Sequence, residues 1–264
     1  MSRFPILMYH RIVSAECPVP GGDAEEARYA VDLDEFRWQM DRISSSGRRG
    51  VSMRAVLDSL EGEGSVPPDW VAVTFDDGNR SDFVHALPVL TEHGFSATFF
   101  VGSERLGADG GLEPGMMSAM AASGMEIGSH GVTHRFLTTL TAQEEEDELS
   151  LSRQALEAVA GVEVSIYAPP GGRIDSRGID ALQRLSYRAV CTSEFGLNPC
   201  RGCRFEFRRL PVTAGTAREH FGACVDASIG RLLPAYVRNR GLKLARRVLG
   251  ESGYRRVRKL GLGS

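Results

Sequence analysis

The chain of 264 residues is 42% hydrophobic and 25% charged, which excludes disordered, collagen-like and fibrous proteins and suits one large domain or two small ones. No run of about 18 apolar residues is present to span a bilayer. The net charge of −3 conceals an asymmetry, because the segment from Arg231 to the end carries +9 and the remainder of the chain carries −12.

Short β-prone runs alternate with helical patterns along the chain, as in proteins built from βα units around a parallel sheet. The seven predicted strands are 4–9, 70–75, 96–101, 125–128, 163–168, 188–192 and 208–212. Helices are predicted from Asp34, from Asn79 or Ser81, from Thr141 to about residue 160 and from Asp175 to about residue 186, with a loop over 14–28. The alternation predicts a β/α barrel, and an open doubly wound sheet is the alternative.

The last predicted element mixes apolar and basic residues at helical spacing, which indicates a basic amphipathic helix. We therefore divide the chain into a barrel over 1–230 and a basic tail over 231–264. Such a helix either binds an anionic membrane surface or packs on the acidic barrel. Nucleic acid is not an expected partner, because the body is acidic and no nucleic-acid motif accompanies the tail.

Residues that can do chemistry follow several of the predicted strands. Asp76 and Asp77 end the strand 70–75, His130 and His134 follow the strand 125–128, and His10 ends the strand 4–9. The carboxyl ends of barrel strands open on one rim, so these side chains are expected to meet there.

Two histidines four residues apart lie one helical turn from each other and can bind one ion, although a helix-face pair of structural histidines is the alternative. A carboxylate from a neighbouring strand completes three ligands and leaves a position open for water. A second, uncoordinated carboxylate then accepts a proton from that water, which is the division of labour in metal-assisted hydrolysis.

The segment Thr74–Gly78 (TFDDG), followed by Ser129–His134 (SHGVTH), resembles the first two signature motifs of the polysaccharide deacetylases, the NodB-homology carbohydrate esterases. Further similarity lies in the segments 6–10, 97–101, 124–128 and 167–172, so that the resemblance covers roughly residues 4–215. It implies a distorted (β/α)7 barrel and metal-dependent hydrolysis of an N-acetyl group on an amino sugar of a glycan or glycoconjugate.

The resemblance also assigns roles to individual residues. Asp77, His130 and His134 match the metal ligands, and Asp76 matches the catalytic base. The backbone N–H of Gly171 matches the oxyanion donor, and Pro170 and Tyr9 fall in motifs on the substrate side. The ligand set accepts Zn, and also Co, Ni or Mn.

The chain departs from the family pattern at three positions. Ala168 stands where many members place an arginine that orients the base, and we consider Arg173 and Arg177 as replacements. Gly171 stands where an aromatic residue is usual. The late Leu-His element that supplies the general acid is missing, and we assign its role to His10, with a structural histidine under the rim as the alternative.

Two other functions remain open. A binding or scaffold protein derived from a deacetylase would explain Ala168 and the missing histidine, and two histidines with one carboxylate are also the ligands of non-haem Fe(II) oxygenases. The first residues lack the apolar core and cleavage site of a secretory signal, and five cysteines are sparse and odd in number. We expect a cytoplasmic location, peripheral at the inner membrane face where the tail binds a lipid-linked substrate.

Overall fold

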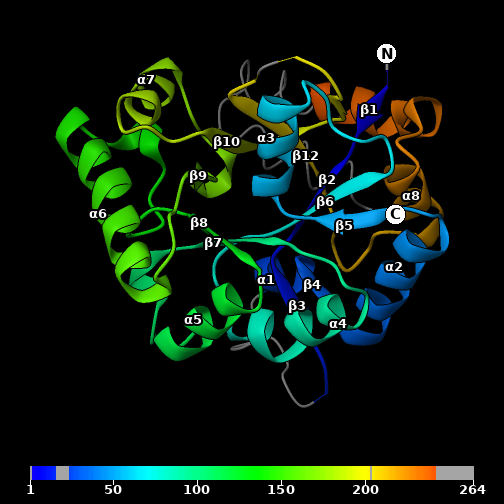
Figure 1. Cartoon of the computed structure of the whole chain (residues 1–264), viewed down its shortest axis with the longest axis horizontal. Helices are drawn as coiled ribbons and strands as arrows, with labels where there is room; N and C mark the ends of the chain where they lie inside the picture. The colour runs from blue at the N-terminus through cyan, green and yellow to red at the C-terminus, as the bar shows by residue number, and fades with distance from the viewer. Residues whose placement is uncertain (1, 16–23, 203, 242–264) are drawn as a thin grey trace.

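A closed barrel of seven parallel strands forms the centre of the molecule in the computed structural model, which describes residues 2–15, 24–202 and 204–241 (Figure 1). The strands are β2 (Ile6–Tyr9), β6 (Trp70–Phe75), β7 (Thr98–Val101), β8 (Glu126–Ser129), β9 (Ile166–Tyr167), β10 (Ala189–Phe195) and β12 (Glu206–Pro211). Their neighbour order is β2, β12, β10, β9, β8, β7, β6, and β2 closes the ring by pairing with β6. The predicted (β/α)7 barrel is confirmed, and each predicted strand overlaps one barrel strand.

Five further short strands lie within the described residues; one of them shares only Phe4 with a predicted strand, and the other four were not predicted from the sequence. β5 (Arg49–Val51) pairs with the first half of β6, and β3 (Arg11–Val13) pairs in parallel with β4 (Ala30–Asp32). β1 (Arg3–Phe4) pairs antiparallel with β11 (Asn198–Pro199). Runs of two or three residues are too short to show a period of two, which is why the sequence pattern did not reveal them.

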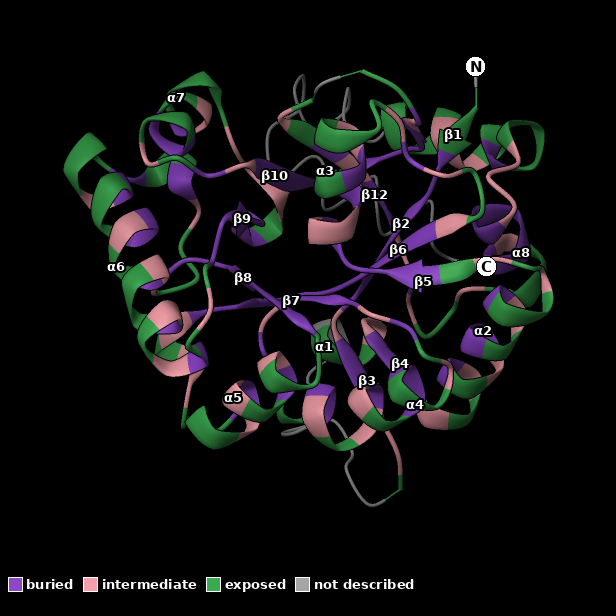
Figure 2. Cartoon of the chain, viewed as in Figure 1, coloured by how far each residue is buried: buried purple, intermediate pink, exposed green. Residues whose placement is uncertain are grey.

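Helices surround the ring of strands, and their buried faces point inward (Figures 1 and 2). They are α1 (Ala24–Arg28), α2 (Leu33–Ser45), α3 (Met53–Gly62), the π-helix η2 (Asp82–Ala86), α4 (Leu87–Glu92), α5 (Pro114–Ala122), α6 (Ala142–Ala160), α7 (Ser176–Arg184), α8 (Arg218–Val225) and a helix over 229–241. Short 3₁₀ turns are η3 (Ser103–Arg105), η4 (Leu137–Thr139) and η5 (Pro170–Gly172).

Side-chain caps fix the starts of several helices where the sequence predicts them. The Thr141 side chain accepts a hydrogen bond from the Glu144 backbone, and the Glu144 carboxylate accepts one from the Thr141 backbone, which is the predicted capping box. Asp175 caps α7, whereas Asp32, two residues before the predicted start, caps α2. The predicted loop over 14–28 is corrected at its end, because Ala24–Arg28 is helical.

One end of the barrel is closed by α3, which lies across the ring of strands in Figure 1. The backbone N–H groups of Met53 and Arg54 donate to the side chains of Thr98 and Glu126, at the first residues of β7 and β8. Val56 and Leu57 belong to the same apolar cluster as Phe100 and other barrel residues. Because α3 covers the amino ends of the strands, the rim formed by their carboxyl ends is the one that can hold a site.

The helix over 229–241 crosses the expected boundary after residue 230. Leu232 is buried in the main core, and Ala235 and Tyr236 pack against it, so the first turns of the expected tail are attached to the barrel. Residues 242–264 of that tail lie outside the described residues.

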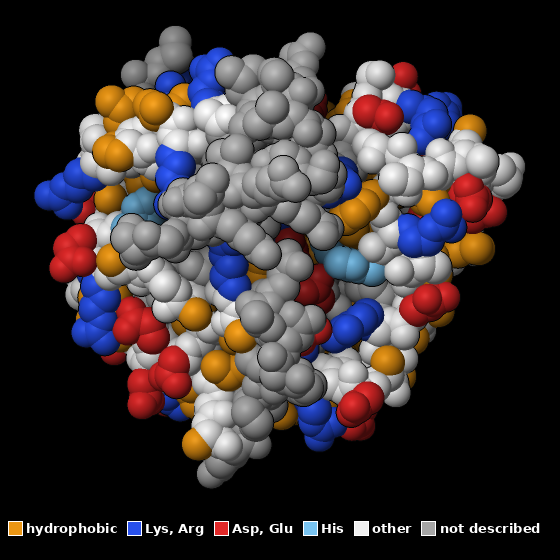
Figure 3. All heavy atoms as spheres, turned by 180° about the vertical axis from the view of Figure 1, so that it is seen from behind, with side chains coloured by type: hydrophobic (Ala, Val, Ile, Leu, Met, Phe, Trp, Pro, Cys, Tyr) orange, Lys and Arg blue, Asp and Glu red, His pale blue; other side chains and the backbone are white. Residues whose placement is uncertain are grey.

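Each helix among the described residues is too short or too polar to cross a lipid bilayer. On the side opposite to that of Figure 1, acidic and basic side chains alternate around the edge (Figure 3).

Candidate metal and catalytic site

A strained turn at the end of β6 presents the two adjacent carboxylates. Asp77 has φ of 82° and Gly78 has φ of 69°, both in the left-handed region. A Cβ at Gly78 would lie 2.7 Å from Cγ1 of Val101, so the turn leaves no room for a side chain at this position. The backbone therefore holds the Asp77 carboxylate in a conformation that an ordinary turn would not maintain.

The Asp77 carboxylate meets both histidines that follow β8. Its Oδ1 lies 3.4 Å from Nε2 of His130 and 3.3 Å from Nε2 of His134. Residues 130–134 form a loop, with φ of 60° at His134, and not the helical turn expected from the spacing. The two imidazoles converge, as predicted, but they do so because the loop folds back and not because they share one face of a helix.

The ligand atoms of the three side chains lie close enough together to hold one divalent metal ion. These atoms lie within 4.8 Å of one another. Ligands at about 2.0–2.1 Å from a tetrahedral zinc lie roughly 3.3 Å apart, which matches the two Nε2 to Oδ1 distances. Nδ1 of His130 lies 2.7 Å from the carbonyl oxygen of Ala168, which fixes the ring and leaves Nε2 for the metal. The residues fit a metal centre.

Proximity of the three groups changes their proton affinities. Burial alone would raise the pKa of Asp77, but hydrogen bonds from His130 and His134 hold the pKa well below the ordinary value. Burial would lower the pKa of His130, and the neighbouring Asp77 and Asp76 carboxylates raise it above the ordinary value. The carboxylate is therefore ionised and available as a ligand at neutral pH.

Asp76 turns away from this triad toward Arg209, a residue that the sequence analysis did not place in the site. The two nitrogens of the guanidinium donate to the two carboxylate oxygens of Asp76 at 2.6 and 2.8 Å, a bidentate ion pair. Both side chains are almost completely buried, at 0% and 4% exposure. Burial alone would raise the pKa of Asp76, but the charge of Arg209 holds it below the ordinary value.

Arg209 is itself anchored on three sides inside the barrel. Its Nε donates to the carbonyl oxygen of Thr192 at 3.0 Å, one terminal nitrogen donates to Oγ1 of Thr74 at 3.3 Å, and its charge lies 5.4 Å from the Phe100 ring centroid. The only sequence signal for this role was its position two residues after the inward-facing Phe207 in a predicted strand, since alternate residues share one face of a strand.

Neither arginine that we considered as a replacement performs this role. The Arg173 guanidinium lies 3.9 Å above the Phe136 ring. Arg177 donates to the Glu145 carboxylate and to the carbonyl oxygens of Leu137 and Leu140. Both expectations were wrong, because Arg173 packs on Phe136 and Arg177 lies on α7 against Glu145, whereas Arg209 of β12 reaches Asp76 inside the barrel.

His10 lies beside the carboxylate pair at the end of β2. Its Nδ1 is buried without a hydrogen-bond partner among the described residues, and its ring lies 4.4 Å from that of Tyr29. Burial lowers the pKa of His10, against an opposing effect of the charges of Asp76 and Asp77. The amide of Asn79 donates to the His10 carbonyl oxygen at 3.1 Å and fixes the backbone here.

Tyr9 does not face the site. It is buried between the barrel and α2, and its hydroxyl donates to Oε1 of Gln39 at 2.8 Å. Its assignment to the substrate side was wrong, because alternate residues of β2 point to opposite faces and Tyr9 points outward.

Gly171 is exposed in the turn η5, and Pro170 beneath it is buried. Gly171 has φ of 61°, and a Cβ on it would lie 2.8 Å from Cε1 of Phe136. An aromatic ring thus occupies the space beside residue 171, although it comes from the loop after His134.

The loop that carries the histidines is fixed from behind by α6. The buried Glu148 carboxylate accepts hydrogen bonds from the backbone N–H of Val132 at 2.6 Å and of Thr133 at 3.1 Å, and from the Thr133 hydroxyl. This contact was not foreseen, because Glu148 lies within an acidic helical run that is typical of a solvent-exposed face.

Comparison with known proteins relates this site to a family. The family model for polysaccharide deacetylase matches residues 63–190, a range that contains Asp76, Asp77, His130 and His134. The protein YxkH of Bacillus subtilis strain 168 is 26% identical over 226 residues, covering 86% of this chain and 77% of YxkH. The peptidoglycan-N-acetylmuramic acid deacetylase PdaA of the same organism is 27% identical over 153 residues, covering 56% of this chain and 57% of PdaA.

Solved structures share the fold. The Streptococcus pyogenes deacetylase PplD, in complex with acetate, superposes with a TM-score of 0.73 at 24% identity, over 83% of this chain and 96% of PplD. IcaB from Ammonifex degensii superposes with a TM-score of 0.73 at 24% identity, over 86% of this chain and 98% of IcaB.

Proposed function

Because the chain belongs to the polysaccharide deacetylase family, we propose that it is a metal-dependent hydrolase that removes the N-acetyl group from an N-acetylated amino sugar of a glycan or glycoconjugate. One observation carries this proposal. Asp77 meets His130 and His134, whereas the adjacent Asp76 stays out of the triad in a buried ion pair with Arg209. One carboxylate is thus available as a ligand, and the other as a base.

Asp77, His130 and His134 would hold a divalent ion, which would supply the Lewis acidity that hydrolysis of an amide needs. We assign zinc to the site, with Co, Ni or Mn as substitutes, because the nitrogen and oxygen donors suit all four ions. Asp76 accepts a proton from the attacking water through lone pairs that Arg209 leaves unused, since each carboxylate oxygen has two. The Gly171 N–H donates to the oxyanion.

The leaving amine needs a proton, and we assign its donor as His10. Two observations support this role: its Nδ1 has no hydrogen-bond partner among the described residues, and the ring feels the charges of both carboxylates. Burial lowers the pKa of His10, so the ring is neutral near pH 7. During the reaction Asp76 takes a proton from water and passes it to His10, which then donates it to the leaving amine. An His10→Gln variant should therefore release acetate at least about a hundredfold more slowly with unchanged metal content. Unchanged turnover would leave His10 as a structural histidine.

The alternative of an inactive scaffold protein loses one of its two supports. It was motivated by the missing late histidine and by Ala168 in place of the arginine that orients the base, and Arg209 supplies a guanidinium to the same carboxylate from another strand. Acetate released from N-acetylated chito-oligosaccharides, measured with the full-length protein, tests the proposed function directly. Turnover should disappear with a chelator and return with added zinc. No acetate from any glycan tested with the metal-loaded protein would favour the scaffold.

We further propose that the substrate is lipid-linked and meets the enzyme at the cytoplasmic face of the membrane. The buried free thiols of Cys191, Cys200 and Cys224 and the basic composition after residue 230 support this location. Fractionation of cells that express the tagged full-length chain checks it, since recovery of the protein outside the cell would contradict it.

A further inference from the structure

Exposed apolar side chains gather on the helix over 229–241. Of the five large hydrophobic residues that are exposed in the described part of the chain, three lie on this helix. Ile229, Leu233 and Val237 are 54%, 53% and 61% exposed, and their spacing of four residues places them on one face. Contiguous exposed apolar surface of this kind marks a site of interaction.

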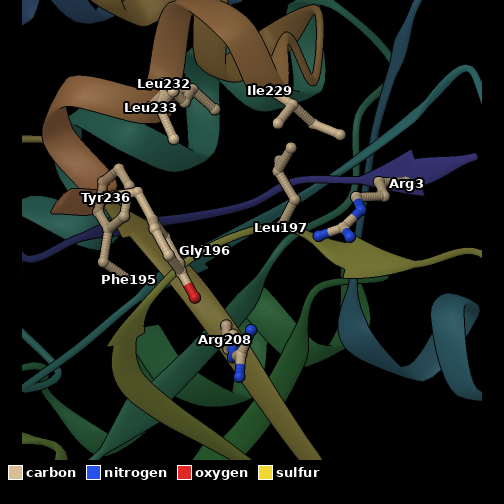
Figure 4. Close-up of a pocket in the computed structure, with 9 residues that line it drawn as sticks. All are labelled: Arg3, Phe195, Gly196, Leu197, Arg208, Ile229, Leu232, Leu233 and Tyr236. Carbon is tan, nitrogen blue, oxygen red and sulfur yellow. The ribbon is translucent and has the colours of Figure 1, made fainter. Parts of the chain in front are cut away.

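A pocket of about 240 Å³ opens beside this apolar face, between the helix and the strands (Figure 4). Ile229, Leu233 and Tyr236 line it from the helix, and the guanidinium groups of Arg3 and Arg208 lie on the strand side. The Arg208 side chain is partly neutralised by Glu194 at 3.8 Å, whereas Arg3 is exposed at the start of β1. An apolar hollow with two cations at its edge suits an amphiphile with a negative head.

The charges along the helix have the same sign. Every ionisable side chain from 229 to 241, apart from Tyr236, is an exposed arginine, namely Arg231, Arg238 and Arg240. At 3.6 residues per turn, Arg240 lies in line with the apolar face, and Arg231 and Arg238 lie on the other side. The sequence that follows, 242–264, adds seven Lys and Arg against one Glu.

We propose that this surface, formed by Ile229, Leu233, Val237, Arg240 and the pocket with Arg3 and Arg208, docks on an anionic phospholipid bilayer. The apolar side chains enter the boundary between headgroups and acyl chains, and the arginines bind lipid phosphate. A bilayer fits better than a second copy of the chain, because two copies would bring arginines of like charge together. Docking on the bilayer is independent of the proposed activity, and only its link to a lipid-linked substrate rests on the proposed function. The test measures vesicle binding and does not depend on turnover.

Vesicle sedimentation of the full-length protein tests the proposal, with phosphatidylcholine vesicles that contain or lack phosphatidylglycerol. The protein should bind only the anionic vesicles. Replacing Leu233 and Val237 together by Gln should weaken binding about tenfold, because two side chains no longer enter the lipid. The matched control is Leu151→Gln, since Leu151 is also 53% exposed but lies on the acidic helix α6, and it should bind as the wild type does.

Replacing Arg3 and Arg208 together by Gln should also weaken binding about tenfold and reduce the preference for anionic vesicles. All these variants should release acetate from soluble chito-oligosaccharides at the wild-type rate, so loss of vesicle binding and loss of catalysis are distinguishable. Equal binding by the Leu233/Val237 variant and the Leu151 control would overturn the proposal. Failure of the protein to bind any vesicles would also overturn it, and so would binding that depends only on residues 242–264. A dimer in sedimentation velocity that the Leu233/Val237 substitutions dissociate would show that the surface binds a second copy of the chain, and would overturn the proposal as well.

Discussion

Arg209 determines the charge state of Asp76, because a carboxylate buried in the barrel would otherwise hold its proton at higher pH. The bidentate pair places a positive charge 2.6 and 2.8 Å from the two oxygens and lowers the pKa of Asp76. A base must be ionised to accept a proton, so the arginine keeps Asp76 in the form that can act as a base at neutral pH.

We expect Arg209→Gln to lower the free energy of unfolding by about 3 kcal/mol, because Asp76 is left buried without a counter-charge. The acid limb of the pH profile of kcat/KM should move to higher pH, since the pKa of Asp76 rises. Arg209→Lys keeps the charge without the bidentate geometry and should give an intermediate shift. Urea denaturation and acetate release between pH 4 and pH 9 measure both effects, and an unmoved acid limb in the Gln variant would show that Arg209 has a packing role only.

The same pair makes stability depend on pH in a defined direction. Because the folded-state pKa of Asp76 lies below the ordinary carboxyl value, the stabilisation is complete above that ordinary value. It is lost as the pH falls through the folded-state pKa.

Two constraints act on a side chain at residue 171, namely its left-handed backbone conformation and the neighbouring Phe136 ring, and mutations can separate them. Gly171→Ala should cost about 2 kcal/mol of unfolding free energy, of which about 1 kcal/mol comes from a Cβ at φ of 61° and the rest from the contact with Phe136. Gly47→Ala is the matched control, because Gly47 has φ of 70° and no atom within 4 Å of the added Cβ.

Adding Phe136→Ala to Gly171→Ala should remove the contact part of the cost and leave the backbone part, as thermal and urea unfolding of the set will report. If Gly47→Ala and Gly171→Ala cost the same, the Phe136 ring does not restrict residue 171.

At the scale of elements, α6 acts on the metal site through Glu148. Its carboxylate accepts the backbone N–H groups of Val132 and Thr133, so it holds the loop in which both histidines point at Asp77. Glu148→Gln should weaken zinc affinity by about 10- to 100-fold, as replacements behind metal ligands commonly do.

Competition with a zinc-binding dye measures this affinity for the Glu148 variant. Glu146→Gln on the same helix is the control, since Glu146 is exposed and only reaches Arg184 at 3.8 Å. Equal affinities in the two variants would show that the loop keeps its shape without α6.

The sequence predicted elements well where their signals are local. All seven barrel strands, the Thr141 capping box and the Asp175 cap follow from patterns within a few residues. The two- and three-residue strands carry no such pattern. The loop conformation at 130–134 was missed because HxxxH spacing fits a helix equally well, and φ of 60° at His134 depends on surrounding contacts.

At the scale of the molecule, the roles that could not be predicted depend on closure of the barrel. Asp76 and Arg209 are 133 residues apart, and they meet because β2 pairs with both β6 and β12. No spacing rule connects such positions, whereas the Asp77 and histidine triad was recognisable from motifs that each lie at the end of a strand. The family resemblance supplied the role of the arginine but not its position.

The division of charge also belongs to the whole molecule. The −12 body forms the barrel and contains every residue of the candidate site, and the +9 segment begins on a helix that is already attached to the barrel core. This arrangement couples the tail to the catalytic domain without a flexible linker at residue 230.

The separate duties of the two adjacent carboxylates are tested most directly by measuring metal content and acetate release together in Asp76→Asn and His130→Ala. Asp76→Asn should retain bound zinc and lose turnover by at least about a thousandfold, because it removes the base and leaves the ligands. His130→Ala should lose both zinc and turnover. Equal loss of zinc in the two variants, or turnover retained in Asp76→Asn, would contradict the account.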